Sequence, residues 1–141
     1  MTEGIDNNTQ EFTTQEFNAA VAKAAVVTGA STGIGEATVR ALRTEGWTVY
    51  AVARRADRLE ALAAETGAVA LPADVTDDAD VARLVDEVTR AGGIDTLINV
   101  AGGARGADKV AEAKTEDWEW MFEVNVLGTI CLLYTSPSPR D

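Results

Sequence analysis

The sequence predicts an α/β fold in which helices cover both faces of a doubly wound parallel sheet. Short runs of apolar and β-branched residues alternate with segments of helical periodicity, a pattern typical of parallel strands joined by right-handed crossovers. The first such run, Val26–Thr28, leads directly into the glycine-rich segment Gly29–Gly35. A glycine-rich turn between a strand and a helix predicts a phosphate-binding site at the edge of the sheet.

The expected elements follow one another in strict alternation. Residues 1–22 are polar, with acidic but no basic side chains, and predict a flexible extension ahead of the first strand. The expected strands cover 24–28, 47–53, 68–71 and 94–100, and the expected helices begin at 33, 57, 76 and 115. This order predicts the spatial order 3-2-1-4, a Rossmann-type sheet truncated after the fourth strand and the helix that follows it.

Local signals predict the helix starts and the buried helix faces. In the first helix, Ala37, Ala41 and Leu42 are expected to face the sheet. Asp57, with a glutamate three residues later, predicts a capped start for the second helix, and Thr76 is the expected cap of the third. The third helix has apolar residues at i, i+3, i+4 and i+7, which are Val81, Leu84, Val85 and Val88.

The fourth helix, expected from Thr115, carries an apolar stripe interrupted by the polar Asn125. The stripe comprises Trp118, Met121, Phe122 and Val126. Trp118, Trp120 and Phe122 are compatible with an aromatic binding surface, although packing in the core and between helices is the favoured interpretation.

Composition excludes several classes of protein. The chain has 141 residues, enough for one domain with a core, and a formal net charge of −11, which argues against binding to nucleic acid or anionic membranes. One cysteine and no histidine exclude an internal disulfide, a Cys/His metal site and a histidine-based triad. Because we identify no secretory signal and no membrane-spanning run, we expect a cytoplasmic location.

Each glycine of the turn has its own expected role. Gly29 allows the chain to leave the strand sharply, Gly33 allows a ligand to approach the backbone, and Gly35 allows the helix to pack closely. The N–H groups and the positive dipole end of that helix suit a pyrophosphate. The turn residues expected to contact a cofactor are Gly29, Ser31, Thr32, Gly33, Ile34 and Gly35.

Four motifs in the right order make residues 23–130 resemble the short-chain dehydrogenase/reductase family. Thr28–Gly35 resembles the family's TGxxxGxG cofactor turn, and Asp74–Val75 resembles its adenine-contacting pair. Asn99–Gly102 resembles its NNAG motif, with a valine in place of the second Asn, and Asn125 resembles the Asn of its catalytic tetrad. Beyond the turn, the implied cofactor contacts are Asp74, Val75, Asn99, Ala101 and Gly102.

The resemblance implies an oxidoreductase that transfers a hydride between a nicotinamide cofactor and a small secondary alcohol or carbonyl substrate. The intact protein is expected to be a homo-oligomer and to use no metal. Asn125 is implied to position a water and the active-site lysine. Asp74 has a competing role as a helix cap, and Asn99 has a competing structural role between strands. Residues 116–118, Glu-Asp-Trp, are similar to those of NADP-dependent dehydrogenases of serine and short 3-hydroxy acids.

The end of the second strand predicts NADP rather than NAD as the cofactor. NAD-specific relatives usually carry an acidic residue there to hold the ribose 2′-hydroxyl, whereas this chain has Arg54 and Arg55. Guanidinium groups pair with a 2′-phosphate, preferably through a bidentate fork. The alternative is that one or both arginines are solvated loop charges.

The chain departs from the family pattern in its catalytic residues. Tyr50 and Tyr134 are the only tyrosines, and neither is followed four residues later by lysine, so no Tyr-x-x-x-Lys is present. The family's fifth strand, which carries the catalytic serine, is absent as well. We therefore predict that the 141-residue chain is catalytically inactive and marginally stable. A non-catalytic dinucleotide-binding module or redox sensor is the alternative function.

The segment 131–141 interrupts the expected helical pattern and resembles the translation of a transposase-type sequencing adapter. Our hypothesis is that native sequence ends near Ile130 and that 131–141 is an adapter-derived tail. A natural Pro/Ser-rich tail is the alternative.

Overall fold

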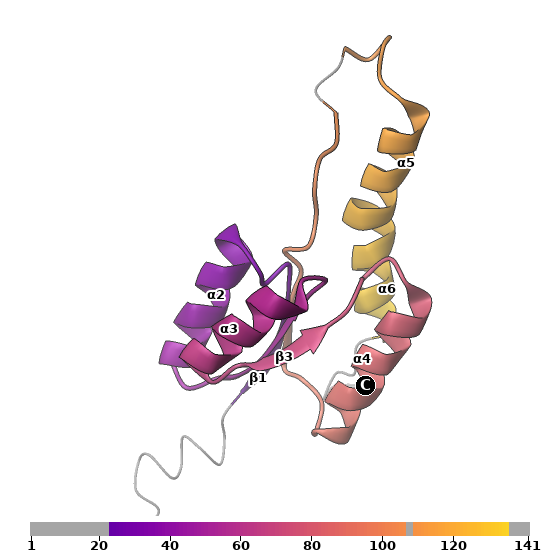
Figure 1. Cartoon of the computed structure of the whole chain (residues 1–141). Helices are drawn as coiled ribbons and strands as arrows, with labels where there is room; N and C mark the ends of the chain where they lie inside the picture. The colour runs from indigo at the N-terminus through magenta and orange to yellow at the C-terminus, as the bar shows by residue number, and fades with distance from the viewer. Residues whose placement is uncertain (1–22, 107–108, 136–141) are drawn as a thin grey trace, which may run out of the picture.

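The computed structural model describes residues 23–106 and 109–135, which form a four-stranded sheet with helices on both faces (Figure 1). The predicted extension 1–22 and the last residues of the predicted tail, 136–141, lie outside the described residues. The strands are β1 (Ala24–Thr28), β2 (Thr48–Ala53), β3 (Val69–Pro72) and β4 (Thr96–Ile98). The helices are α2 (Gly33–Thr44), α3 (Ala56–Thr66), α4 (Asp78–Arg90), α5 (Thr115–Phe122), the π-helical turn η1 (Glu123–Leu127) and α6 (Gly128–Thr135).

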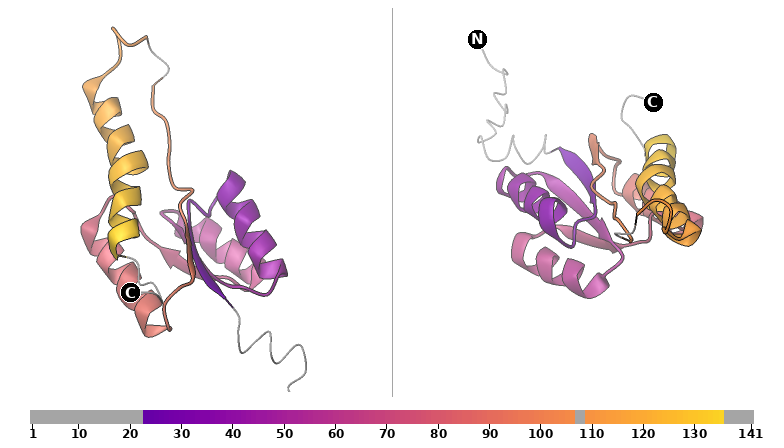
Figure 2. Two further views of the ribbon diagram at one scale, coloured as in Figure 1. Left: turned by 180° about the vertical axis from the view of Figure 1, so that it is seen from behind. Right: turned by 90° about the horizontal axis from the view of Figure 1, so that it is seen from above.

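All strands are parallel and lie in the order β3-β2-β1-β4, which confirms the predicted fold class and strand order. In β1, Val26 pairs with Tyr50 on one side and with Leu97 on the other. Successive side chains of a strand point to opposite faces. Val26 therefore joins the core beneath α4 and α6, and Val27 joins the core beneath α2 and α3. Figure 2 shows these two helical layers on either side of the sheet.

The layer formed by α2 and α3 is built as the periodicity predicts, with one correction. Leu59 and Leu62 are buried against the sheet, as expected for α3. The prediction that Ala37 and Ala41 face the sheet is wrong, because both are exposed. Val39 is fully buried instead, and it lies between Gly35 and Leu42 at i, i+4 and i+7 on one helical face.

Two predicted helix caps are also wrong. At α3, Arg55 rather than Asp57 occupies the N-cap position, and it makes no side-chain cap hydrogen bond. At α4, the cap is Asp77, whose carboxylate accepts a hydrogen bond of 3.0 Å from the Asp80 N–H. Thr76 does not cap α4 because its hydroxyl donates to another carboxylate, at the end of β3.

The segments α5, η1 and α6 form one continuous helical arm, which rises beyond the sheet at its α5 end (Figure 1). The helix continues to Thr135, so the expected break after Ile130 is wrong, and Leu132 is buried in the core beside α4. The predicted packing of the apolar stripe is also wrong, because Trp118 is 51% exposed and Phe122 is 54% exposed. The α6 end of the arm is packed against α4.

Candidate functional site

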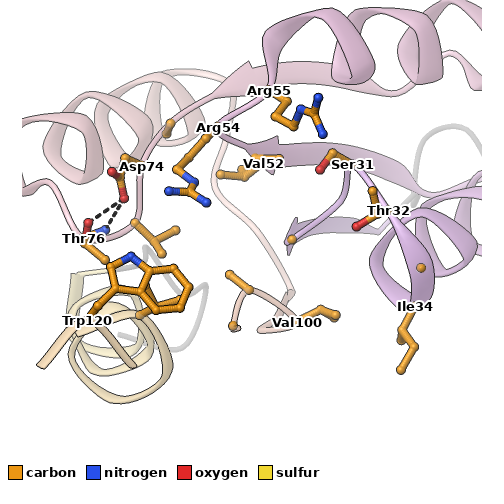
Figure 3. A pocket seen from close by; sticks show the side chains of 18 residues that line it. Ser31, Thr32, Ile34, Val52, Arg54, Arg55, Asp74, Thr76, Val100 and Trp120 are labelled. Carbon is orange, nitrogen blue, oxygen red and sulfur yellow. Dashed lines mark hydrogen bonds between the residues drawn. The ribbon is translucent and has the colours of Figure 1, made fainter. Parts of the chain in front are cut away.

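A cavity of about 460 Å³ opens at the carboxyl ends of the strands, where the prediction places the ligand crevice (Figure 3). Its walls come from the turn after β1, the ends of β2 and β3, the segment after β4, and the arm. This is the point at which the strand order reverses, because the chain leaves β3 at one side of the sheet and enters β4 at the other side of β1. The volume suits a small organic ligand or cofactor.

The glycine turn is built so closely that side chains are excluded at two positions. Gly29 has a φ of 64°, and a Cβ there would lie 2.8 Å from the backbone nitrogen of Ala101. A Cβ on Gly35 would lie 2.0 Å from the carbonyl oxygen of Gly29. The predicted close approach at Gly35 is therefore made to the turn itself, and it fixes the start of α2 against that turn.

A buried hydroxyl joins this turn to the segment after β4. The Thr28 side chain is fully buried, and its Oγ1 accepts hydrogen bonds of 3.1 Å from the N–H groups of both Val100 and Ala101. The two backbone segments that form the centre of the cavity are thus held together by one side chain. The sequence pattern does not predict this role of Thr28.

The start of α2 presents a surface suited to an anion. Ser31, Thr32, Gly33 and Ile34 all line the cavity. Thr32 is the N-cap residue, yet it makes no side-chain cap hydrogen bond, and no atom lies within 4 Å of a Cβ built on Gly33. The first N–H groups of a helix lack intrahelical partners and carry the positive end of the dipole. This end of α2 is therefore available to a phosphate group.

Two arginines at the end of β2 add positive charge to the cavity wall. Arg54 and Arg55 both line the cavity and are exposed, and neither forms an ion pair within the described part of the chain. Figure 3 shows Arg55 near Ser31, whereas Arg54 extends toward the end of the cavity where Asp74 and Trp120 lie. Both guanidinium groups are therefore placed to pair with an anionic group of a ligand.

Asp74 organises the loop between β3 and α4. One carboxylate oxygen accepts hydrogen bonds from the Thr76 N–H, at 2.9 Å, and from the Thr76 hydroxyl, at 2.6 Å. Partial burial acts to raise the pKa of Asp74, but these hydrogen bonds and the charge of Arg54 outweigh it, so the pKa lies below its ordinary value. Asp74 is thus an ionised acceptor in the cavity wall at neutral pH.

Asn125, the predicted catalytic residue, holds the segment after β4. Its Oδ1 accepts a hydrogen bond of 3.1 Å from the Gly103 N–H, and its Nδ2 donates to the carbonyl oxygens of Gly103 and Met121, both at 2.8 Å. It lies in the π-helical turn η1, and such turns are frequent at functional sites. Asn125 does not itself line the cavity, so its observed contacts position backbone rather than a ligand.

The structure brings together most of the residues predicted to bind a cofactor. Within the described residues, all of them line the cavity except Gly35, which packs behind the turn, and Asn99, which lies just after β4. The cavity is also lined by residues that the sequence analysis did not predict, which are Val52, Ala53, Ala73, Thr76, Val100, Trp120 and Val124. Most of these residues lie at or just after the ends of strands, whereas Trp120 lies on α5, which is distant from those strand ends in sequence. No group of three or more candidate metal-ligating side chains occurs among the described residues.

Comparison with known proteins identifies the class that this fold and cavity define. A family model described as short chain dehydrogenase matches residues 23–136, so the chain belongs to the short-chain dehydrogenase family. Among helices of the described ranges, none has the length and apolar character needed to cross a membrane.

Individual relatives refine this assignment. The chain is 56% identical over 108 residues to an uncharacterised oxidoreductase of Mycobacterium tuberculosis, covering 77% of this chain and 42% of the relative. It is 40% identical over 108 residues to serine 3-dehydrogenase of Agrobacterium fabrum, covering 74% and 43%. A solved structure, the closed form of serine dehydrogenase complexed with NADP+, superposes with a TM-score of 0.75 at 32% identity, covering 79% and 46%. The chain thus spans less than half the length of these relatives.

Proposed function

We propose that this chain is the cofactor-binding part of an oxidoreductase that transfers a hydride between NADP and a secondary alcohol or carbonyl compound. The observation that carries the preference for NADP is the pair Arg54 and Arg55, which lines the cavity without ion-pair partners among the described residues. An acidic side chain at the end of β2 would instead hold the 2′-hydroxyl of NAD. The relative that was solved with NADP+ supports the same choice.

The residues around the cavity fit an anionic dinucleotide. The uncapped start of α2 and the open space beside Gly33 suit the phosphates, and the two arginines suit a 2′-phosphate. When bound, the cofactor supplies or accepts the hydride. The chain's own residues bind and orient it, with Thr28 and Gly29 fixing the two backbone segments at the centre of the cavity.

We also propose that Asn125 acts as a positioning residue for proton transfer, as the resemblance implies. Its hydrogen bonds to Gly103 support a role in holding the backbone beside the cavity. The 141-residue sequence contains no Tyr-x-x-x-Lys, the pair that transfers the proton in the family pattern. We therefore expect the 141-residue chain to bind cofactor without transferring a hydride.

Binding of NADPH and NADH to the purified chain tests the cofactor assignment. Replacing Arg54 or Arg55 with serine removes a charge-assisted contact, so we expect NADPH affinity to fall by about 10- to 100-fold and NADH affinity to change by less than about threefold. Arg54→Asp should enlarge this difference. Arg58→Ser is the matched control, because Arg58 lies on α3 but does not line the cavity. Equal losses for both cofactors would refute the preference for NADP.

A non-catalytic dinucleotide-binding module, such as a redox sensor, is the second candidate function. It is supported by the same cavity residues, which fit a dinucleotide whether or not the cofactor takes part in a reaction. The two functions differ in the behaviour of a longer reading frame from the source genome, assayed with NADP and short hydroxy acids such as serine. Turnover would establish the oxidoreductase, whereas cofactor binding without turnover would favour the binding module. For the intact protein we retain the proposal of a cytoplasmic homo-oligomer.

A further inference from the structure

We propose that Trp120 is a stacking surface for the adenine ring of the dinucleotide. This inference rests on the proposed function, because it places one part of the proposed cofactor within the cavity. Trp120 lies on α5 and lines the cavity, and Figure 3 shows its indole ring beside Thr76, with Arg54 extending toward it from the end of β2. The ring therefore forms part of the wall opposite a planar cationic side chain.

The orientation of Trp120 is specific to its position on the helix. Trp118 lies two residues earlier, which is a rotation of about 200° around the helix axis, so the two side chains project from opposite faces. Trp118 is 51% exposed and does not line the cavity. The two tryptophans of α5 thus provide an internal comparison between a cavity position and a solvent position.

The indole ring is held in place before any ligand binds. The guanidinium carbon of Arg105 lies 4.0 Å from the ring centroid, a cation–π contact. A Cβ on Gly103 would lie 2.7 Å from the Trp120 ring, so the indole packs closely against the backbone of that glycine. The Asn125 amide in turn holds Gly103 by two hydrogen bonds. A ring fixed in this way loses little conformational freedom when a base stacks on it.

The chemistry around Trp120 favours adenine over nicotinamide. The start of α2, which suits the pyrophosphate, lies next to Ser31 and Thr32, toward the other end of the cavity in Figure 3. Asp74, whose carboxylate accepts hydrogen bonds, lies at the same end of the cavity as Trp120 in Figure 3, and the apolar Val75 also lines the cavity. A planar base with an exocyclic amino group matches a stacking surface next to an acceptor, and base–aromatic stacking is a general source of affinity.

Tryptophan fluorescence tests the inference directly, because the chain has three tryptophans: Trp47, Trp118 and Trp120. In the full 141-residue chain carrying Trp47→Phe and Trp118→Phe, the emission comes from Trp120 alone. We expect adenosine 2′,5′-bisphosphate, which contains adenine but no nicotinamide, to change this emission upon saturation. Nicotinamide mononucleotide at matched concentration is expected to leave it unchanged.

Affinities measured by calorimetry provide the second readout. Trp120→Ala should weaken binding of adenosine 2′,5′-bisphosphate about tenfold, Trp120→Phe should restore most of the loss, and the matched control Trp118→Ala should stay within about twofold. If neither this nucleotide nor NADPH binds the parent chain, the proposed function fails and the inference fails with it. If they bind but leave both Trp120 emission and Trp120→Ala affinity unchanged, only the inference is overturned. A response to nicotinamide mononucleotide alone would overturn the choice of adenine.

Discussion

The α2–α3 layer differs from the α5–η1 part of the arm in how it uses apolar side chains. Under α2 and α3, Val39 and Leu59 are fully buried against β1 and β2. On the arm formed by α5, η1 and α6, Trp118, Phe122 and Leu127 are 51%, 54% and 43% exposed. Both segments show helical apolar periodicity in the sequence, yet Val39 and Leu59 are buried, whereas these three residues of α5 and η1 are not.

The difference follows from what lies next to each segment. Helices α2 and α3 belong to consecutive strand–helix–strand units, so the strands that cover their apolar faces are immediate neighbours in sequence. The arm follows β4, which pairs only with β1 among the described strands. Apolar periodicity therefore predicts that a helix has a face to bury, but it does not indicate which element of the fold covers that face.

Of the predicted effects, the largest is the difference in stability between truncating an apolar side chain of the α2–α3 layer and truncating one of the arm. Leu59→Ala removes a fully buried side chain and should lower the free energy of unfolding by about 2–5 kcal/mol. Phe122→Ala removes a side chain that is 54% exposed and should change it by no more than about 0.5 kcal/mol. Urea denaturation followed by circular dichroism measures both. A loss at Phe122 equal to that at Leu59 would show that the arm face is covered in solution.

A methyl group added within the glycine turn should have the next largest effect. Gly35→Ala places a Cβ against the Gly29 carbonyl oxygen, so we expect a loss of stability of about 3 kcal/mol and weaker binding of NADPH. Gly46→Ala is the matched control at the opposite end of α2. Its φ of 88° makes the substitution unfavourable by about 1 kcal/mol, but no atom lies within 4 Å of its Cβ. Unchanged NADPH affinity in Gly35→Ala would show that the turn tolerates a shift.

Much of the α2–α3 layer and its strands could be predicted, because the sequence patterns that define them are local. The strand β1 has the predicted bounds, and Leu59 and Leu62 face the sheet as their spacing indicates. The glycine turn also lies where its motif predicts. The error at the start of α4 comes from competition between neighbouring polar groups. Thr76 resembles a helix cap in sequence, but its hydroxyl donates to Asp74, so Asp77 becomes the cap.

The rest of the site could not be predicted because it depends on contacts between distant segments. Trp120 enters the cavity only because the arm lies beside the end of β3, and its sequence neighbours give no indication of this. The Thr28 hydroxyl reaches Val100 across two adjacent strands, a contact between residues 72 positions apart. Asn125 hydrogen-bonds to the backbone of Gly103, 22 positions away, a contact that its sequence pattern does not indicate. Predicting such contacts requires knowing how the strands are aligned with one another in the sheet.

Removing the buried hydroxyl of Thr28 tests how the cavity is held together. Thr28→Val keeps the shape of the side chain but leaves the N–H groups of Val100 and Ala101 without their acceptor, so we expect a loss of about 2 kcal/mol. Thr28→Ser should recover most of it. Thr44→Val, which removes an exposed hydroxyl on α2, should change stability by less than about 0.5 kcal/mol. Equal effects at Thr28 and Thr44 would argue against a joining role for Thr28.

The smallest effect on stability should come from Asp74, in the loop between β3 and α4. Its dependence on pH distinguishes this effect from those of the other substitutions. The pKa of Asp74 in the folded chain lies below its ordinary value of 3.8, so ionised Asp74 stabilises the folded state. That contribution is complete above the ordinary value and is lost as the pH falls through the lowered folded pKa. Asp74→Asn should therefore be less stable than the parent at neutral pH, and the difference should shrink as the pH falls below the ordinary value. Thr76→Val, which removes one of the two hydrogen bonds from Thr76, should retain part of this pH dependence.

Denaturation midpoints measured from neutral to acidic pH check the prediction. A difference between Asp74→Asn and the parent that stays constant with pH would mean that the Asp74 charge does not stabilise the loop.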